Sequence, residues 1–381
     1  MTESYESSSN QTSVKSCDTN EGVSIEKKQN ELRRANGILD GILNTAVEVN
    51  ASDVHIISGL EPIFRLNGRL TGEVIRKGIL ENRLIRLFAE GICTKKQWEQ
   101  FLELGEVDLA YDLHGKARFR VNIFKEISGV SIAFRKIPAK IPTLEELAMP
   151  SILREMVYRS QGLFLVTGPT GSGKSTTLAA MIDYLNETKK THILTLEDPI
   201  EYVHHHKNSI IAQREIGRDT ESFGNGLRAA LRQDPDVILV GELRDLDTIS
   251  IALTAAETGH LVLGTLHTSS AASTIERIVD VFPPEQQSQI QTQLAGAITG
   301  ILSQRLLPNY ESSGRVAMTE MLVNTKAVAN LIRSGKTHMI ANVLQMGKAD
   351  GMYTMEDSIR HAIQRGMVDV DSAENLLESG D

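Results

Sequence analysis

The segment "GPTGSGKSTTLAAM", residues 168–181, decides the fold of the second half of this chain. It fits the phosphate-loop pattern G-x-x-x-x-G-K-[ST], with an apolar strand-like run before it (162–167) and a helix-like run after it (175–185). In such a loop the glycines let backbone N–H groups turn toward phosphates, the lysine reaches the β- and γ-phosphate oxygens, and the last hydroxyl holds Mg²⁺. We therefore expect a nucleotide and Mg²⁺ to bind at Gly168, Pro169, Thr170, Gly171, Ser172, Gly173, Lys174, Ser175 and Thr176.

Composition narrows the class of protein. The 381 residues are enough for two domains, and 41% of them are hydrophobic. No apolar run approaches the ~18 residues of a membrane span, and the first sixteen residues lack the apolar core of a signal peptide. The sequence therefore predicts a soluble, cytoplasmic chain. The formal charge of −9 argues against bulk binding of nucleic acid, so we expect no nucleic-acid partner.

The first 140 residues predict a polar tail followed by a small α+β domain. Residues 1–30 contain almost no large apolar side chains, which is typical of a disordered tail. Strand-like runs and a helical stretch (81–105) follow, and Asn67-Gly68 is a hairpin turn signal. Prolines near residue 140 mark a linker, so this domain is expected to cover 31–140. An apolar helical face before the strands comprises Ile38, Leu39, Ile42, Leu43 and Ala46.

The rest of the chain, 141–381, predicts an α/β domain. The runs "GLFLVTG", "THILTLED", "DVILVGEL" and "LVLGTLHT" are near-continuous apolar strands that alternate with helical segments. That pattern indicates a parallel sheet with helices on both faces. After Pro308 the chain is expected to be mainly helical to its end.

Acidic residues follow two of these strands. Glu242 stands just past the run 236–241, where phosphate-loop enzymes face Mg²⁺ and the γ-phosphate. Glu197, Asp198 and Glu201 lie at another strand end, where ligands bind in parallel sheets. A carboxylate there can polarise an attacking water and bind the metal. The alternatives are a solvated strand-end glutamate and ordinary acidity of a surface loop.

Histidines flank the last of these strands. His260 and His267 are seven residues apart, so a regular strand puts them on opposite faces and they are not expected to share a metal. His267, at the carboxyl end, is the candidate sensor of the γ-phosphate, and a structural histidine is the alternative. The three consecutive histidines at 204–206 are interpreted as a solvated loop.

Arginines of the first domain are candidates for a role in catalysis. The strand-like run 117–137 carries Arg118, Arg120 and Arg135. An arginine on a separate domain can reach nucleotide held by a neighbouring one and stabilise charge in the transition state. For each arginine the alternative is an ordinary surface charge.

Taken together, these segments resemble the type II/IV secretion ATPase superfamily, the hexameric motors of pili and secretion systems. The phosphate loop, "LTLEDPIEY" (194–202), "DPDVILVGELRD" (234–245) and "TGHLVLGTLHT" (258–268) stand in that family's order and spacing, and the agreement spans about 40–365. Within it, "VANLIRSGK" (328–336) and the other segments are most similar to the type IV pilus retraction ATPases, the PilT family. Assembly and type II secretion ATPases usually carry a tetracysteine module, whereas this chain has two cysteines. The polar tail and the helical end depart from the family.

The resemblance implies a PAS-like N-terminal domain, a RecA-like ATPase domain with a helical C-terminal end, and a ring of six. ATP and Mg²⁺ would bind at the loop, with Ser175 and Glu242 holding the metal. Glu242 would be the leading catalytic carboxylate, and the other implied catalytic residues are Glu197, Glu201, His267, Arg120 and Arg135.

The function implied is an ATP-driven motor for pilus retraction, located in the cytoplasm and associated with the inner membrane at the pilus base. Its partners would be an inner-membrane platform protein and paralogous pilus motor ATPases. A pilus-assembly or type IV secretion ATPase, and an accessory subunit that binds nucleotide without hydrolysing it, remain as alternatives. A DNA-handling ring is disfavoured by the acidic charge and by only nine Phe and one Trp to stack bases.

Overall fold

Apolar residues build two separate large cores in this chain. The computed structural model describes residues 19–66, 68–75, 78–138, 140–311 and 314–378. Contacts divide the chain into two units, the first ending at Ile137 and the second beginning at Pro138. The predicted boundary, after residue 140, lies three residues later in the same proline-marked segment.

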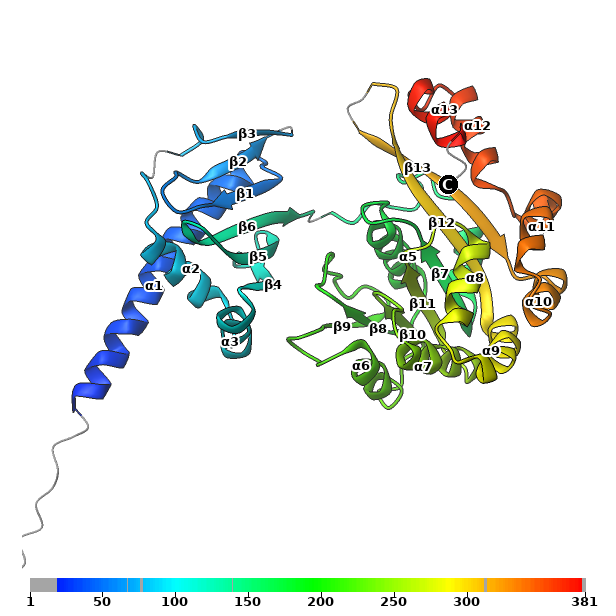
Figure 1. The fold of residues 1–381 in the computed structure, drawn as a ribbon, viewed down its shortest axis with the longest axis horizontal. Helices are drawn as coiled ribbons and strands as arrows, with labels where there is room; N and C mark the ends of the chain where they lie inside the picture. Colours follow the sequence, from blue (N-terminus) through cyan, green and yellow to red (C-terminus); the bar gives the residue numbers. More distant parts are fainter. Residues whose placement is uncertain (1–18, 67, 76–77, 139, 312–313, 379–381) are drawn as a thin grey trace, which may run out of the picture. The chain divides into compact units, whose positions relative to one another are not determined.

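The first unit is a six-stranded antiparallel sheet with three helices (Figure 1). The strand order is β3-β2-β1-β6-β5-β4. The predicted hairpin joins β2 and β3, where Leu66 pairs with Arg69 and Gly68 has a φ of 81°; Asn67 lies outside the described residues. The strands are β1 (Asp53–Ile56), β2 (Ile63–Leu66), β3 (Arg69–Thr71), β4 (Glu106–Asp112), β5 (Arg118–Glu126) and β6 (Gly129–Ile137).

Helix α1 (Thr19–Glu48) begins inside the predicted tail. The predicted apolar face is confirmed, because Leu39, Ile42, Leu43 and Ala46 are fully buried. Residues 26–34 of the helix are exposed or half-buried and rich in Glu, Lys and Arg, which are good helix formers. A helix nucleated by packing can continue through such a segment, so the absence of apolar residues did not exclude helix from Thr19 onward. Residues 1–18 of the predicted tail lie outside the described part.

One predicted helical stretch is two helices, α2 (Asn82–Ile92) and α3 (Lys95–Leu104). The break occurs because Thr94 caps α3: its hydroxyl accepts from the backbone N–H of Gln97, and the Gln97 side chain returns a bond to the Thr94 backbone. Strand β4, which the sequence did not predict, follows directly.

The second unit contains a seven-stranded sheet in the order β13-β12-β7-β11-β10-β8-β9. All neighbouring pairs are parallel except β12 and β13, which confirms the predicted parallel sheet. Every residue of β7, β10 and β11 is buried, which explains their unbroken apolar runs. The strands are β7 (Gly162–Thr167), β8 (His192–Glu197), β9 (Ile210–Glu215), β10 (Val237–Val240), β11 (Leu261–Leu266), β12 (Ile298–Pro308) and β13 (Arg315–Val323).

Most helices of this unit pack around the sheet and share one core with it (Figure 1). Two short 3₁₀ turns, η1 (Thr337–Met339) and η2 (Gly347–Asp350), flank α11. Among the described residues no helix combines the length and the apolar character needed to cross a bilayer. The helices are α4 (Ile152–Tyr158), α5 (Lys174–Thr188), α6 (Phe223–Ala230), α7 (Leu246–Glu257), α8 (Ala271–Asp280), α9 (Pro284–Ala297), α10 (Lys326–Arg333), α11 (Ile340–Met346), α12 (Met355–Gln364) and α13 (Val370–Glu378).

The prediction that the chain is mainly helical after Pro308 is wrong for β13. Its sequence, "RVAMTEMLV", contains good helix formers, yet it pairs along its whole length with β12, from Arg315 opposite Pro308 to Val323 opposite Gly300. Tertiary pairing here overrides local preference. The helices α12 and α13 then pack on the two strands in a third, small core that includes Leu307, Met318, Ile359, Ala362, Val368 and Ala373.

The burial along α1 predicts how far the chain can be shortened. Lys28 forms an ion pair with Glu90, worth at most about 1 kcal/mol, and within the range 26–48 Ala35 is the first buried residue. A chain starting at Gln29 should therefore unfold close to the full-length midpoint. A chain starting at Gly41 also loses Leu39 from the core, which costs about 2–5 kcal/mol.

Thermal unfolding of both shortened chains checks this. Equal destabilisation of the two would mean that the exposed part of α1 contributes as much as the buried face, contrary to the burial pattern.

Candidate nucleotide-binding site

The predicted site residues of the second unit follow the carboxyl ends of neighbouring parallel strands. Leu266 on β11 pairs with Thr167 on β7, and Val240 on β10 pairs with both Gly264 and Leu196. The phosphate loop after β7, Glu242 after β10 and His267 after β11 therefore leave the sheet at one edge. This is the edge at which ligands bind in open parallel sheets.

The loop between β7 and α5 has a backbone that only glycine adopts readily. Gly168, Gly171 and Gly173 have φ values of 145°, 80° and 90°. A Cβ at Gly168 would lie 2.2 Å from the carbonyl oxygen of Gln304, and one at Gly173 would lie 2.8 Å from Gln304 Nε2. At two of the pattern's positions, glycine is therefore favoured both by the positive φ and by close contact with Gln304 of strand β12.

Lys174 is buried at the start of α5. Its Nζ donates to the carbonyl oxygens of Gly168 at 2.8 Å and Pro169 at 3.0 Å. Burial lowers the pKa of Lys174, and the charges of Glu242 and Glu201 oppose that shift. The ammonium is thus held inside the curve of the loop, where a phosphate would sit.

The hydroxyls of the loop suit a phosphate and a metal. Ser172 Oγ is buried and has no hydrogen-bond partner among the described residues, so it can donate to a bound oxygen. Ser175 is exposed in the first turn of α5, whereas the Thr176 hydroxyl lies 3.0 Å from the Tyr202 hydroxyl. A buried ammonium, an unpaired hydroxyl and a glycine cradle at a helix N-terminus fit the phosphates of a nucleotide.

Gln304 on β12 holds the loop, and the sequence did not indicate it. Its Nε2 donates to the carbonyl oxygen of Ser172 at 2.8 Å, and its Oε1 accepts from the Thr177 hydroxyl at 2.8 Å. The neighbouring Ser303 hydroxyl accepts from Thr167, the last residue of β7, at 3.0 Å. No pattern surrounds Gln304 in the sequence, and its role follows only from the pairing of β12 with β7.

Glu242 makes contacts on two sides and is not a solvated strand-end residue. Arg244 Nε lies 2.5 Å from Glu242 Oε1, and His267 Nε2 lies 3.5 Å from the same oxygen. The other nitrogen of His267 is 3.5 Å from the Thr170 hydroxyl in the phosphate loop. The hydrogen bond to Glu242 is the main reason that the pKa of Arg244 is raised. Arg244 was missed by the sequence analysis, although it stands two residues after Glu242.

Glu197 is held by neighbours on two strands. Its Oε1 accepts from the Thr195 hydroxyl at 2.6 Å and from Gln213 Nε2 at 3.1 Å. Burial raises the pKa of Glu197, while these hydrogen bonds oppose the shift. Gln213 also donates to the Tyr202 carbonyl oxygen at 2.8 Å and so ties β9 to the turn that carries Glu201.

The other histidines do not belong to a metal cluster. His260 lies before β11 and its Nδ1 contacts the Ala255 carbonyl oxygen at 3.1 Å, at the opposite end of the strand from His267. Within the described part of the chain, no three metal-binding side chains come together. The loop 204–206 is not simply solvated: His206 Nδ1 accepts from the Ile211 backbone at 3.1 Å, and burial lowers the pKa of His204 to about 4.

The candidate arginines of the first unit are cross-strand neighbours. Arg120 on β5 pairs with Arg135 on β6, and Arg135 pairs in turn with Asp53 on β1. Asp53 accepts from Arg135 Nε at 2.9 Å and lies 3.6 Å from Arg65 Nε. Burial alone would raise the pKa of Asp53, but its hydrogen bonds and the two arginines outweigh burial and lower it.

Comparison with known proteins extends over nearly the whole chain. Residues 28–375 match the family described as type II/IV secretion system protein. A Pseudomonas aeruginosa protein named as the type IV pilus retraction ATPase PilT is 46% identical over 337 residues, which cover 88% of this chain and 96% of the relative. A Neisseria gonorrhoeae twitching motility protein is 50% identical over 287 residues, covering 75% of this chain and 76% of the relative.

A crystal structure of the pilus retraction motor PilT with bound ADP is similar in fold. It superposes with a TM-score of 0.81 at 45% identity, covering 88% of this chain and 95% of that one. This similarity confirms the predicted α/β fold. It also confirms the resemblance of the sequence motifs to those of the pilus retraction ATPases.

The contacts of Gln304 predict its contribution to the site. Gln304→Ala removes the side-chain donor to the Ser172 carbonyl oxygen and the oxygen acceptor of the Thr177 hydroxyl, which keeps only a sulfur contact with Met149. The loss should cost about 1–3 kcal/mol of stability and weaken ADP binding. Gln293→Ala is the matched control, because the Gln293 side chain on α9 donates to Glu257 at 3.4 Å in an exposed contact. Chemical unfolding and calorimetric titration with ADP measure both effects. Wild-type ADP affinity in Gln304→Ala would show that the loop keeps its shape without this side chain.

Proposed function

Because the chain belongs to the type II/IV secretion system protein family, we propose that it is an ATP-hydrolysing motor that retracts type IV pili. The observation that carries the proposal is the similarity to pilus retraction ATPases along almost the full length of both chains. The phosphate loop, Glu242 and His267 lie at one edge of the sheet, and this arrangement supports the proposal that the protein hydrolyses ATP.

The phosphates of ATP would bind the loop, with Lys174 exchanging its carbonyl partners for the β- and γ-phosphate oxygens. Ser175 and Glu242 would hold Mg²⁺, which when bound neutralises charge that develops on the phosphate oxygens. Gly168, Pro169, Thr170, Gly171, Ser172, Gly173 and Thr176 would complete the nucleotide contacts.

Glu242 would orient the attacking water, since it follows β10 beside the loop and its side chain is oriented by Arg244 and His267. His267 lies between Thr170 of the loop and Glu242. A γ-phosphate at the loop would change both contacts, which suits His267 to report whether ATP or ADP is bound. Glu197 and Glu201 would support the metal and the water.

Several finer assignments belong to the same proposal. The first unit would be a PAS-like domain, in keeping with its antiparallel sheet and helices, and the second a RecA-like domain. Six subunits would form a ring in the cytoplasm at the inner-membrane base of the pilus. The ring would act on a membrane platform protein alongside paralogous motor ATPases. The resemblance of the motifs to secretion and pilus motors supports these assignments.

Two alternatives stand beside retraction. A pilus-assembly or type IV secretion ATPase would share the catalytic motifs and differ in its C-terminal and partner surfaces. The intact phosphate loop and the presence of Glu242 argue against a subunit that binds nucleotide without hydrolysing it. Retraction is favoured because proteins named for pilus retraction match this chain at 45–46% identity over 88% of its length.

Substitution of the catalytic carboxylate tests the proposal. Glu242→Gln keeps the shape of the side chain and removes its charge, so ATP hydrolysis should fall by ~10²- to 10⁴-fold, as for other positioned catalytic groups. Nucleotide binding should persist, whereas Lys174→Ala should lose it. In the host, Glu242→Gln should leave cells with more surface pili and no retraction.

The measurements are ATPase rate, ADP affinity and pilus counts by microscopy. Loss of pili in the Glu242→Gln strain would identify an assembly motor instead. A fall in hydrolysis of less than about threefold, well short of the expected range, would transfer the catalytic role to Glu197 or Glu201.

Arg135 and Arg120 are proposed to reach the γ-phosphate when the two domains close on ATP. Arg135→Ala should then lower hydrolysis by up to ~10³-fold and leave ADP affinity nearly unchanged, because ADP has no γ-phosphate. Arg65→Ala is the matched control, since it removes the other arginine beside Asp53. ATPase rate and ADP affinity are measured for both variants. Equal rates in Arg135→Ala and Arg65→Ala would assign Arg135 a structural role only.

A further inference from the structure

A hollow of about 380 Å³ begins at the phosphate loop. Gly173 and Thr176 of the loop line it, and so do Met149, from the segment before α4, and Leu306 on β12. Its volume lies within the range of ligand pockets, about 300–1,000 Å³. A nucleotide anchored by its phosphates extends its ribose and base away from the loop, so a hollow that starts there can receive them.

One wall of the hollow is a tight turn, residues 143–149, in the segment that connects the two units. The Thr143 hydroxyl accepts from the Glu146 backbone at 3.1 Å, and Glu146 Oε2 accepts from the Thr143 backbone at 2.9 Å. The backbone N–H of Met149 donates to the carbonyl oxygen of Leu144 at 2.9 Å, and Leu144 is buried in the core of the second unit. The turn is therefore held to the core while its last residue lines the hollow.

The walls of the hollow are apolar where they meet the loop and α5. Met149 Sδ lies 4.0 Å from the Thr177 hydroxyl on α5. A Cβ on Gly173 would lie 3.7 Å from Leu306 Cδ1, which places Leu306 in van der Waals reach of the end of the loop. Leu147 also lines the hollow and, like Met149 and Leu306, is half-buried. These side chains keep apolar surface in contact with water, and covering it with a planar base would be favourable.

Two polar side chains that line the hollow are already hydrogen-bonded within the protein. Glu146 Oε1 accepts from Lys140 Nζ at 2.6 Å, and the amide of Gln304 bonds both the loop and α5. Arg315, at the start of β13, also lines the hollow and is exposed. Recognition of a ligand in the hollow would therefore rest chiefly on apolar contact.

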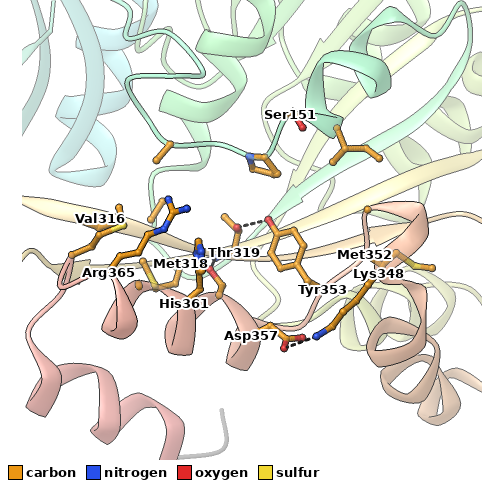
Figure 2. Close-up of a pocket in the computed structure, with 18 residues that line it drawn as sticks. Ser151, Val316, Met318, Thr319, Lys348, Met352, Tyr353, Asp357, His361 and Arg365 are labelled. Carbon is orange, nitrogen blue, oxygen red and sulfur yellow. Dashed lines mark hydrogen bonds and ion pairs between the residues drawn. The ribbon is translucent and has the colours of Figure 1, made fainter.

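The hollow adjoins a larger cavity of about 680 Å³, because Ala148, Val316 and Met367 line both (Figure 2). Figure 2 shows this cavity between the segment that carries Ser151 and helix α12, with Val316 of β13 on one side. A base in the hollow would thus have the loop on one side and open space on another. The hollow should therefore select against small bases, which cover less apolar surface, and set no steric limit on purines.

We propose that Met149, Leu147 and Leu306 form the subsite for the base of the nucleotide. The segment that connects the two units would then contact the base, whereas the loop contacts the phosphates. The inference rests on the proposed function, because it assumes that a nucleotide binds at the loop. A base in the hollow packs on the turn 143–149 and stabilises its hydrogen bonds, and a ligand without a base leaves the turn unchanged.

Calorimetric titration of the full-length chain with Mg²⁺ and three ligands, ADP, CDP and inorganic pyrophosphate, tests the subsite. Met149→Ala should weaken ADP binding by ~10-fold or more, the lower end of the effect of one methylene in a hydrophobic pocket. Its affinity for pyrophosphate should stay unchanged, which also shows that the variant has folded. CDP has a single-ring base, so wild type should bind it less tightly than ADP, and this difference should shrink in Met149→Ala.

Met346→Ala is the matched control, because Met346 on α11 is 86% exposed; it should bind all three ligands as wild type does. Hydrogen exchange of a peptide covering 143–151 reports on the turn. In wild type ADP should slow this exchange and pyrophosphate should not. The slowing by ADP should be lost in Met149→Ala at a concentration that saturates wild type only.

Equal weakening of ADP and pyrophosphate in Met149→Ala would assign Met149 to support of the loop and overturn the base subsite, and so would unchanged ADP affinity. Equal slowing of exchange at 143–151 by both ligands in wild type would also overturn it. That result needs no variant and so does not depend on whether Met149→Ala folds. Failure of the proposed function is seen separately, because a chain that shows the expected ADP binding but hydrolyses no ATP would keep the subsite and lose the motor.

Discussion

The buried ammonium of Lys174 is the constraint on which the rest of the second unit depends. A charge in the interior needs polar partners on every side, and here the carbonyl oxygens of Gly168 and Pro169 provide them. Those carbonyls face inward because glycines of the loop adopt positive φ values. The loop keeps this conformation because Gln304 donates a hydrogen bond to the Ser172 carbonyl oxygen. The acidic residues Glu242 and Glu201 then oppose the effect of burial on the lysine.

The site is therefore completed by a strand far from it in sequence. Strand β12 pairs with β7 on one side and with β13 on the other, so the loop is braced by residues more than 120 positions later in the chain. Parallel strands place the loop, Glu242 and His267 at one edge, and the antiparallel β13 brings the C-terminal helices to the same part of the sheet. The candidate site and the C-terminal helices are therefore held by the same backbone-paired strands.

A feature could be predicted from the sequence when it is determined by the residues of its own segment, and not when it depends on pairing with a distant strand. The phosphate loop and the apolar strands were predictable because their spacing and unbroken hydrophobicity follow from their own chemistry. Strand β13 was missed because "RVAMTEMLV" favours helix locally and is a strand only through β12. Gln304 and Gln213 were missed because they act through strand pairing, which a single sequence does not display. The start of α1 was missed because the helix continues from its packed part into an exposed part, and the exposed part has no apolar pattern.

Helix α1 also acts as a spacer. Ala35 stands sixteen positions after Thr19 and is the first buried residue of the range 26–48, and at 1.5 Å per residue that separation corresponds to about 24 Å of helix. A fluorophore attached at Thr19 would stand off from Ala35 by a comparable distance. Such a group would report on what lies around the domain, with little disturbance of the packing within it.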